Sequence, residues 1–111
     1  MGDKQTLLKI KIMSKITLTI ETKEVYFNEM ESTILIGLYL NCMLHTSGEF
    51  GYALDVRKQT GLNVNQYAGY ISSLSKKGVF EYLDNDYSTT YGGQFTFAEG
   101  VYSQLAKITG C

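Results

Sequence analysis

The chain has 111 residues, 44% of them hydrophobic and 19% charged, and its formal net charge is −1. These values indicate one globular domain and exclude a disordered chain, and no apolar run reaches the ~20 residues that a membrane span needs. Two cysteines and one histidine are too few for a disulfide framework or a zinc quartet. We therefore expect a cytoplasmic protein with no metal and no cofactor.

The amino-terminal region combines a short extension with an alternating segment. Residues 1–12 precede a second methionine, Met13, and are expected to be an extension or leader, which leaves residues 13–111 as a single domain. From Lys15 to Glu21, polar and apolar residues alternate strictly, and this alternation predicts a β-strand with one buried face. The apolar positions of that strand are Ile16, Leu18 and Ile20.

A long apolar helix is predicted next. Asn28 followed by Glu31 has the spacing of a capping box, and the residues from Glu29 to about His45 are almost wholly apolar. A helix that is apolar on most sides is buried centrally or buried by a partner. The sequence leaves both options open, so this helix or the early strand could form a homodimer. Cys42 lies in this helix and is expected to be a core residue.

Two shorter helices are predicted to follow, at residues 52–60 and 65–77. Gly61 stands where the chain must reverse between them, and only glycine takes a positive φ without steric penalty. Asn65 is expected to cap the second helix, and Gly78 to end it. The inner face of that helix is predicted to carry Ala68, Ile71 and Leu74.

The last part of the chain alternates again. Residues 79–83 and 94–97 are predicted to be paired antiparallel strands, joined by a polar loop that ends at Gly92 and Gly93. A final helix is expected over residues 98–108. The whole order predicts an α+β fold, a small winged helix-turn-helix domain with an N-terminal strand and a two-stranded wing.

Residues 52–108 resemble the winged helix-turn-helix regulators of the MarR and ArsR kind. The resemblance rests on a turn leucine, spaced apolar positions and a terminal glycine, namely Leu62, Tyr67, Ala68, Ile71, Leu74, Gly78, Val79 and Phe80. It implies that the helix at 65–77 contacts duplex DNA. The side chains expected at such an interface are Asn65, Gln66, Gly69, Tyr70, Ser73, Lys76 and Lys77, with Arg57 and Lys58 on the preceding helix.

The distribution of charge favours a different use of the same fold. There is no Lys or Arg from Val79 to Ala106, whereas a domain that binds duplex DNA usually presents a basic patch. The predicted wing instead carries acids and tyrosines, and tyrosine is favoured at protein interfaces. The candidate docking residues are Asp84, Asp86, Tyr87 and Tyr91.

A second resemblance agrees with docking. Met13 to Thr17, Asn28 and Glu29, Thr33 to Ile36, Lys76 to Val79, and Glu81 are similar to the amino-terminal domain of MotA, the middle-transcription activator family of T-even-type bacteriophages. That resemblance implies a phage-encoded protein whose winged helix docks on the sigma subunit of host RNA polymerase. The chain ends at residue 111, so we expect no separate promoter-reading domain of the kind that family carries.

Two functions therefore remain at the level of sequence. The first is a transcription regulator that contacts DNA through residues 65–77, and the second is an interaction module that docks on a host protein without touching DNA. An uncharged, solvated face is a third interpretation of the outer side of that helix. We do not expect an enzyme, because no nucleophile, base or metal-ligand set occurs in a recognisable arrangement.

Overall fold

The computed structural model describes residues 15–46, 50–84 and 93–110. Over these ranges the chain is a compact α+β domain of four helices and two small antiparallel sheets. In chain order its elements are β1 (Thr17–Ile20), β2 (Lys23–Tyr26), α2 (Glu29–Thr46), β3 (Gly51–Tyr52), α3 (Ala53–Thr60), α4 (Val64–Lys76), β4 (Phe80–Leu83), β5 (Gln94–Phe97) and α5 (Val101–Thr109). None of the helices within these ranges is long and apolar enough to cross a bilayer.

The first sheet is the hairpin of β1 and β2. The alternation predicted for β1 is confirmed, because Ile16, Leu18 and Ile20 are buried while the residues between them are exposed. The partner strand β2 was not predicted. Its turn consists of Glu21 and Thr22, both at positive φ, a conformation that two-residue hairpin turns require but that glycine or asparagine usually signals.

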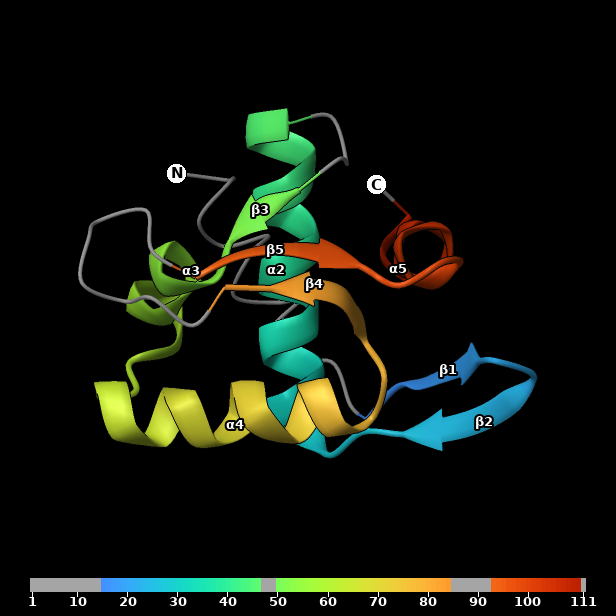
Figure 1. Cartoon of the computed structure of the whole chain (residues 1–111), viewed down its shortest axis with the longest axis horizontal. Coiled ribbons are helices and arrows are strands. Elements are labelled where there is room, and N and C mark those ends of the chain that lie inside the picture. Colours follow the sequence, from blue (N-terminus) through green and yellow to red (C-terminus); the bar gives the residue numbers. More distant parts are fainter. Residues whose placement is uncertain (1–14, 47–49, 85–92, 111) are drawn as a thin grey trace.

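The second sheet has the strand order β3–β5–β4 (Figure 1). The antiparallel pairing of β4 with β5 confirms the predicted strand pair, and Phe80 lies opposite Phe97 in the register. The two-residue strand β3, which pairs with the other side of β5, was not predicted because so short a strand has no periodicity. It places the start of α3 against the same sheet.

Helix α2 forms the centre of the domain, with the sheet and the other helices arranged around it (Figure 1). Residues Ile34, Leu35, Ile36 and Leu38 are at most 1% exposed. The predicted capping box is confirmed, since the Glu31 N–H donates to Asn28 Oδ1 and the Asn28 N–H donates to Glu31 Oε1. The domain itself buries this helix, so its apolar composition requires no second copy of the chain.

The start of α4 differs from the prediction. Asn63, not Asn65, is the N-cap: its Oδ1 accepts from the Gln66 N–H at 2.8 Å, and Gln66 Oε1 accepts from the Asn63 N–H. The reciprocal pair satisfies two donors that the helix start leaves open, which a cap at Asn65 could not do with the residue types that follow it. Asn65 lies inside the first turn and is exposed.

The inner face of α4 is largely as predicted. Ile71 and Leu74 are buried, but Tyr67 takes the buried place that was assigned to Ala68, which is half-buried. The Tyr67 hydroxyl donates to the Ala53 carbonyl and so connects α4 to α3. Gly61 and Gly78 have φ of 75° and 86°, as the predicted reversals need.

The last helix is shorter than expected. It begins at Val101, after a turn at Gly100, rather than at residue 98. Val101 and Leu105 are buried, and Ile108 is half-buried against the core. The Gln104 side-chain amide both accepts from the Thr19 N–H and donates to the Thr19 carbonyl, each at 2.8 Å, which ties α5 to strand β1.

Candidate functional site

The residues predicted to contact DNA do not share one face of α4. Asn65, Gln66, Gly69 and Lys76 are exposed, and the exposed row continues through Ser72 and Ser75. Tyr70 is half-buried and packs against the core. Ser73 and Lys77 are also half-buried, and both turn towards α2 instead of outwards. The predicted interface therefore loses one of the two lysines of α4 and two of its polar side chains, Tyr70 and Ser73.

Glu31 is the reason for that inward orientation. Its carboxylate is 4% exposed and accepts from Lys77 Nζ at 2.8 Å and from Ser73 Oγ at 2.6 Å. The Lys77 ammonium also donates to the Tyr26 carbonyl and lies 5.1 Å from the centroid of the Phe27 ring. This group, which we call the Glu31 cluster (Glu31, Ser73, Lys77 and the Asn28 N–H), joins α2, α4 and the segment after β2.

The cluster also controls the ionisation of Glu31. Burial on its own raises the pKa of this carboxyl, but hydrogen bonds from Lys77, Ser73 and the Asn28 backbone, together with the charge of Lys77, outweigh burial. The net result is a pKa below its ordinary value of 4.5. Glu31 is therefore a charged buried group with every strong partner that such a group needs.

The cations of the preceding helix have separate roles. Arg57 Nη1 donates to the Leu62 carbonyl at 3.0 Å, so the half-buried guanidinium supports the turn between α3 and α4. Its Nε atom is buried without a hydrogen-bond partner. Lys58 is exposed. Of the four cations predicted to face DNA, only Lys58 and Lys76 present an exposed charge.

The predicted wing lies largely outside the described residues, since Asp86, Tyr87 and Tyr91 all fall in the segment 85–92. Asp84 is described: it is half-buried, and its N–H donates to the Gln94 carbonyl at 2.8 Å, which closes the β4–β5 pairing. On strand β4, Tyr82 is 54% exposed. Glu81 next to it is exposed as well, because the register shifts between Phe80 and Tyr82 and breaks the alternation of β4.

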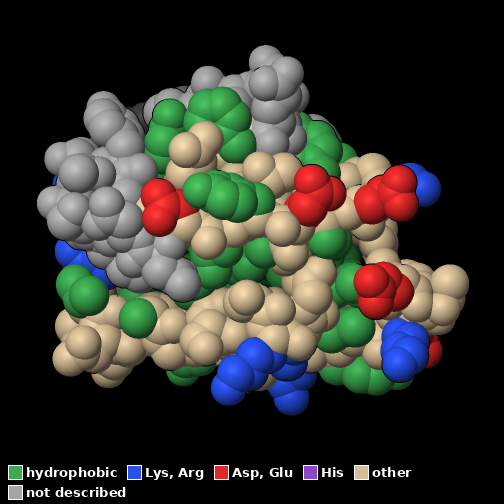
Figure 2. All heavy atoms as spheres, in the orientation of Figure 1, with side chains coloured by type: hydrophobic (Ala, Val, Ile, Leu, Met, Phe, Trp, Pro, Cys, Tyr) green, Lys and Arg blue, Asp and Glu red, His purple; other side chains and the backbone are tan. Residues whose placement is uncertain are grey.

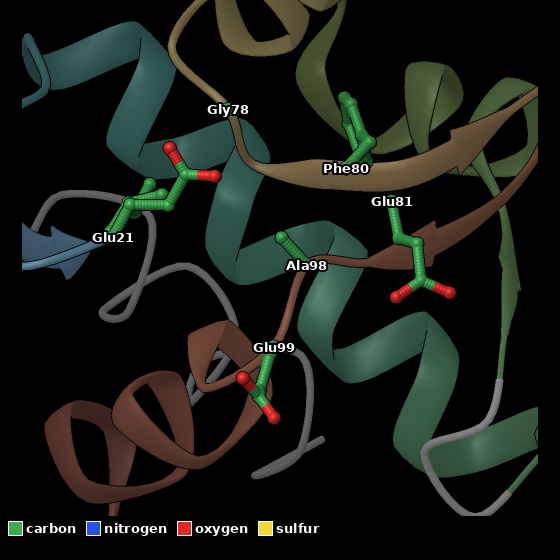
Figure 3. A pocket seen from close by; sticks show the side chains of 7 residues that line it. Glu21, Gly78, Phe80, Glu81, Ala98 and Glu99 are labelled. Carbon is green, nitrogen blue, oxygen red and sulfur yellow. The ribbon is translucent and has the colours of Figure 1, made fainter.

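A pocket opens beside Glu81 (Figure 3). It has a volume of 430 Å³ and lies between the β1–β2 turn, the end of α4, strand β4 and the turn before α5. Ile20, Phe80 and Ala98 supply its apolar wall, and Glu21, Glu81 and Glu99 stand around it. The sequence carries no signal for this grouping, because the three acids come from distant parts of the chain.

Both signs of charge occur on the face drawn in Figure 2. Acidic side chains lie over β4 and β5, basic side chains gather along the edge formed by α4, and the hairpin carries both. Within the described residues no set of three or more His, Cys, Asp and Glu side chains is arranged to hold a metal ion.

Cys42 is fully buried, as predicted, and burial raises its pKa to about 12, so the thiol stays protonated at neutral pH.

Comparisons with models of protein families, with curated proteins and with solved structures found no match for this chain. The functional argument therefore depends on the geometry of the three features described above: the exposed row of α4, the exposed tyrosine of β4 and the acidic pocket.

Proposed function

We propose that this protein is a winged-helix interaction module that docks on another protein through its wing strand, with no catalytic activity. The order of elements supports the winged-helix part of the proposal: a buried helix, a short strand, two helices joined by a tight turn, and two paired antiparallel strands. The short strand β3 completes a three-stranded sheet on the side of β5 away from β4.

The exposure of Tyr82 is the observation that supports docking through β4. A tyrosine that is 54% exposed on an edge strand offers a large contact area with little side-chain entropy to lose. Glu81 is exposed beside it, and no Lys or Arg occurs from Val79 to Ala106. A surface of this composition would repel phosphate and attract a basic protein.

The resemblance to the MotA amino-terminal domain supports a partner in the host transcription machinery, with the sigma subunit of RNA polymerase as the specific candidate. A phage origin and action in the bacterial cytoplasm belong to the same proposal. Strand β4 lies at the edge of its sheet, so main-chain groups as well as Tyr82 are available to a partner.

The test is a binding titration of the full chain with purified bacterial RNA polymerase, as core enzyme and as holoenzyme. Saturable binding of the holoenzyme that Tyr82→Ser weakens at least about fivefold supports docking through β4. Tyr26→Ser is the matched control, because Tyr26 is also on a strand and is 66% exposed, yet lies in the other sheet. Equal effects of the two variants, or no binding at all, would reject the proposal.

Duplex DNA is the second candidate partner, and one observation favours it. The exposed row of α4 contains Asn65, Gln66 and Lys76, and a Cβ added to Gly69 would meet no atom within 4 Å, so a groove wall can approach closely. Asparagine and glutamine pair with adenine edges. Against this, exposed positive charge is limited to Lys58 and Lys76 on α3 and α4.

DNA binding has its own test, a titration at two salt concentrations. With two exposed lysines per protomer, the slope of log K against log salt should be close to −2. Lys76→Ala should reduce both affinity and slope, whereas Lys77→Ala should act mainly through stability, because Lys77 is held by Glu31. Failure to detect binding at low salt would leave docking as the remaining function.

A further inference from the structure

The pocket next to β4 combines an apolar wall with a negative rim. Ile20 and Phe80 come from the two different sheets, and Ala98 follows β5, so the pocket lies at the junction between the sheets. Gly78 forms part of the wall at a φ of 86°, and a Cβ there would approach Ile20 Cγ2 to 3.3 Å. The backbone conformation at Gly78 thus disfavours any side chain that would narrow the pocket.

The three carboxylates of the rim have no counter-charge within the described part of the chain. Glu21, Glu81 and Glu99 are exposed, and the ion pair of the described residues belongs to Glu31 and Lys77. Figure 3 shows their carboxylates pointing in different directions, from three separate elements. They therefore do not converge on one point as ligands of a metal ion do, but surround a surface on which several positive groups can be placed.

We propose that this pocket binds a basic segment of a partner protein, with lysine or arginine side chains on Glu21, Glu81 and Glu99. The inference rests on the proposed docking function and names the chemistry of the partner. Lysine and arginine fit both parts of the pocket, because their aliphatic stems cover apolar surface while their charged ends remain at the rim. Ile20, Phe80 and Ala98 contact the stems.

Charge complementarity selects this occupant over others. Three unpaired carboxylates repel nucleic acid and acidic peptides, and they accelerate the association of a basic one at low salt. The same charges would be costly to cover with an apolar segment, because each carboxylate would lose water without gaining a partner.

The experiment is a fluorescence-anisotropy titration of the full chain with a short labelled peptide in which arginine alternates with leucine. A peptide in which glutamate alternates with leucine is the reference. Binding of the first peptide alone, weakening as salt is added, is the expected result. Glu21→Lys, Glu81→Lys and Glu99→Lys should each weaken it about three- to tenfold.

Glu24→Lys is the matched control for Glu21→Lys. Both residues are exposed glutamates of the same hairpin, and the change of net charge is identical, but Glu24 does not line the pocket. It should change affinity by less than about twofold. Equal losses of peptide affinity for Glu21→Lys and Glu24→Lys would mean that the peptide responds to net charge. That result would overturn the proposed binding in the pocket.

Three further results would also overturn the proposal. Ala98→Leu adds bulk to the apolar wall, so unchanged peptide affinity in this variant would place the peptide elsewhere. Self-association in sedimentation that Glu99→Lys abolishes would assign the pocket to a second copy of the chain. Binding of polymerase with no binding of the arginine peptide would reject the pocket and leave the proposed docking through Tyr82 intact.

Discussion

Two groups of glutamates in this domain meet opposite conditions. Glu31 is almost fully buried and receives an ammonium, a hydroxyl and a backbone N–H. Glu21, Glu81 and Glu99 are exposed around a pocket and have no cation beside them among the described residues. A buried charge must be fully partnered for the fold to be stable, whereas an exposed one can be left for another molecule. The first group is therefore structural, and the second is available for binding.

The pairing of Glu31 limits the polar and positive groups that α4 presents to solvent. Lys77 and Ser73 have the residue types of a DNA contact, but they serve the structural carboxylate. The Lys77 ammonium is paired with Glu31 and is not available to bind phosphate, whereas Glu21, Glu81 and Glu99 remain exposed. Lys76 is the lysine that remains exposed on α4.

The largest effect is expected from the apolar packing that holds the Glu31 cluster together. Leu74 is fully buried on the inner face of α4, next to Ser73. Leu74→Ala should lower the free energy of unfolding by about 2–5 kcal/mol, because it empties a packed site. Urea denaturation measures this, and Ser72→Ala, at an exposed position of the same helix, is the control. A loss under about 1 kcal/mol would show that α4 does not pack as described.

The next effect breaks the Glu31 cluster itself. Lys77→Met keeps the apolar stem but removes the charge, so the Glu31 carboxylate stays buried without its ammonium. Because the Lys77 side chain is 32% exposed, we expect a loss of about 1–3 kcal/mol, below that of a fully buried pair. Lys76→Met, at the exposed neighbouring lysine, should cost less than about 0.5 kcal/mol. Similar losses from both variants would contradict the pairing seen here.

The same cluster predicts a dependence of stability on pH. The pKa of Glu31 is lower in the folded domain than its ordinary value of 4.5, so the charged form is stabilised by folding. This contribution is fully present above pH 4.5 and is lost as the pH falls through the folded pKa. The difference in unfolding free energy between wild type and Glu31→Gln should therefore shrink on acidification. An unchanged difference at about pH 3 would place the dominant titration elsewhere.

The smallest effect on stability is expected at the pocket. Glu21→Gln, Glu81→Gln and Glu99→Gln remove exposed charges that pair with no cation among the described residues, so each should change the free energy of unfolding by less than about 0.5 kcal/mol. Binding of the arginine peptide should nevertheless weaken. A substantial loss of stability in any of the three would mean that its carboxylate has a structural role, and the contrast with Glu31 would fail at that position.

Features that depend on a few neighbouring residues could be predicted from the sequence. The alternation around Ile16, Leu18 and Ile20, the capping box of Asn28 and Glu31, and the reversals at Gly61 and Gly78 were all confirmed. Each is set by geometry within one strand period, one helical turn or one backbone dihedral, so its signal is local. Helix α2, the helix pair and the β4–β5 pairing follow from the same kind of pattern.

The contacts between distant elements could not be predicted from the sequence and depend on how the whole chain packs. Lys77 contacts Glu31 across a sequence separation of 46 residues, and Ser73 contacts it across 42 residues. The pocket brings together glutamates from the first hairpin, strand β4 and the turn before α5. Packing also placed Tyr67 rather than Ala68 on the inner face of α4, beside the predicted Ile71 and Leu74. The role of a charged side chain depends on its burial and on its partners, and both are set when the elements pack. Electrostatic contacts depend on distance in space and not on separation along the chain.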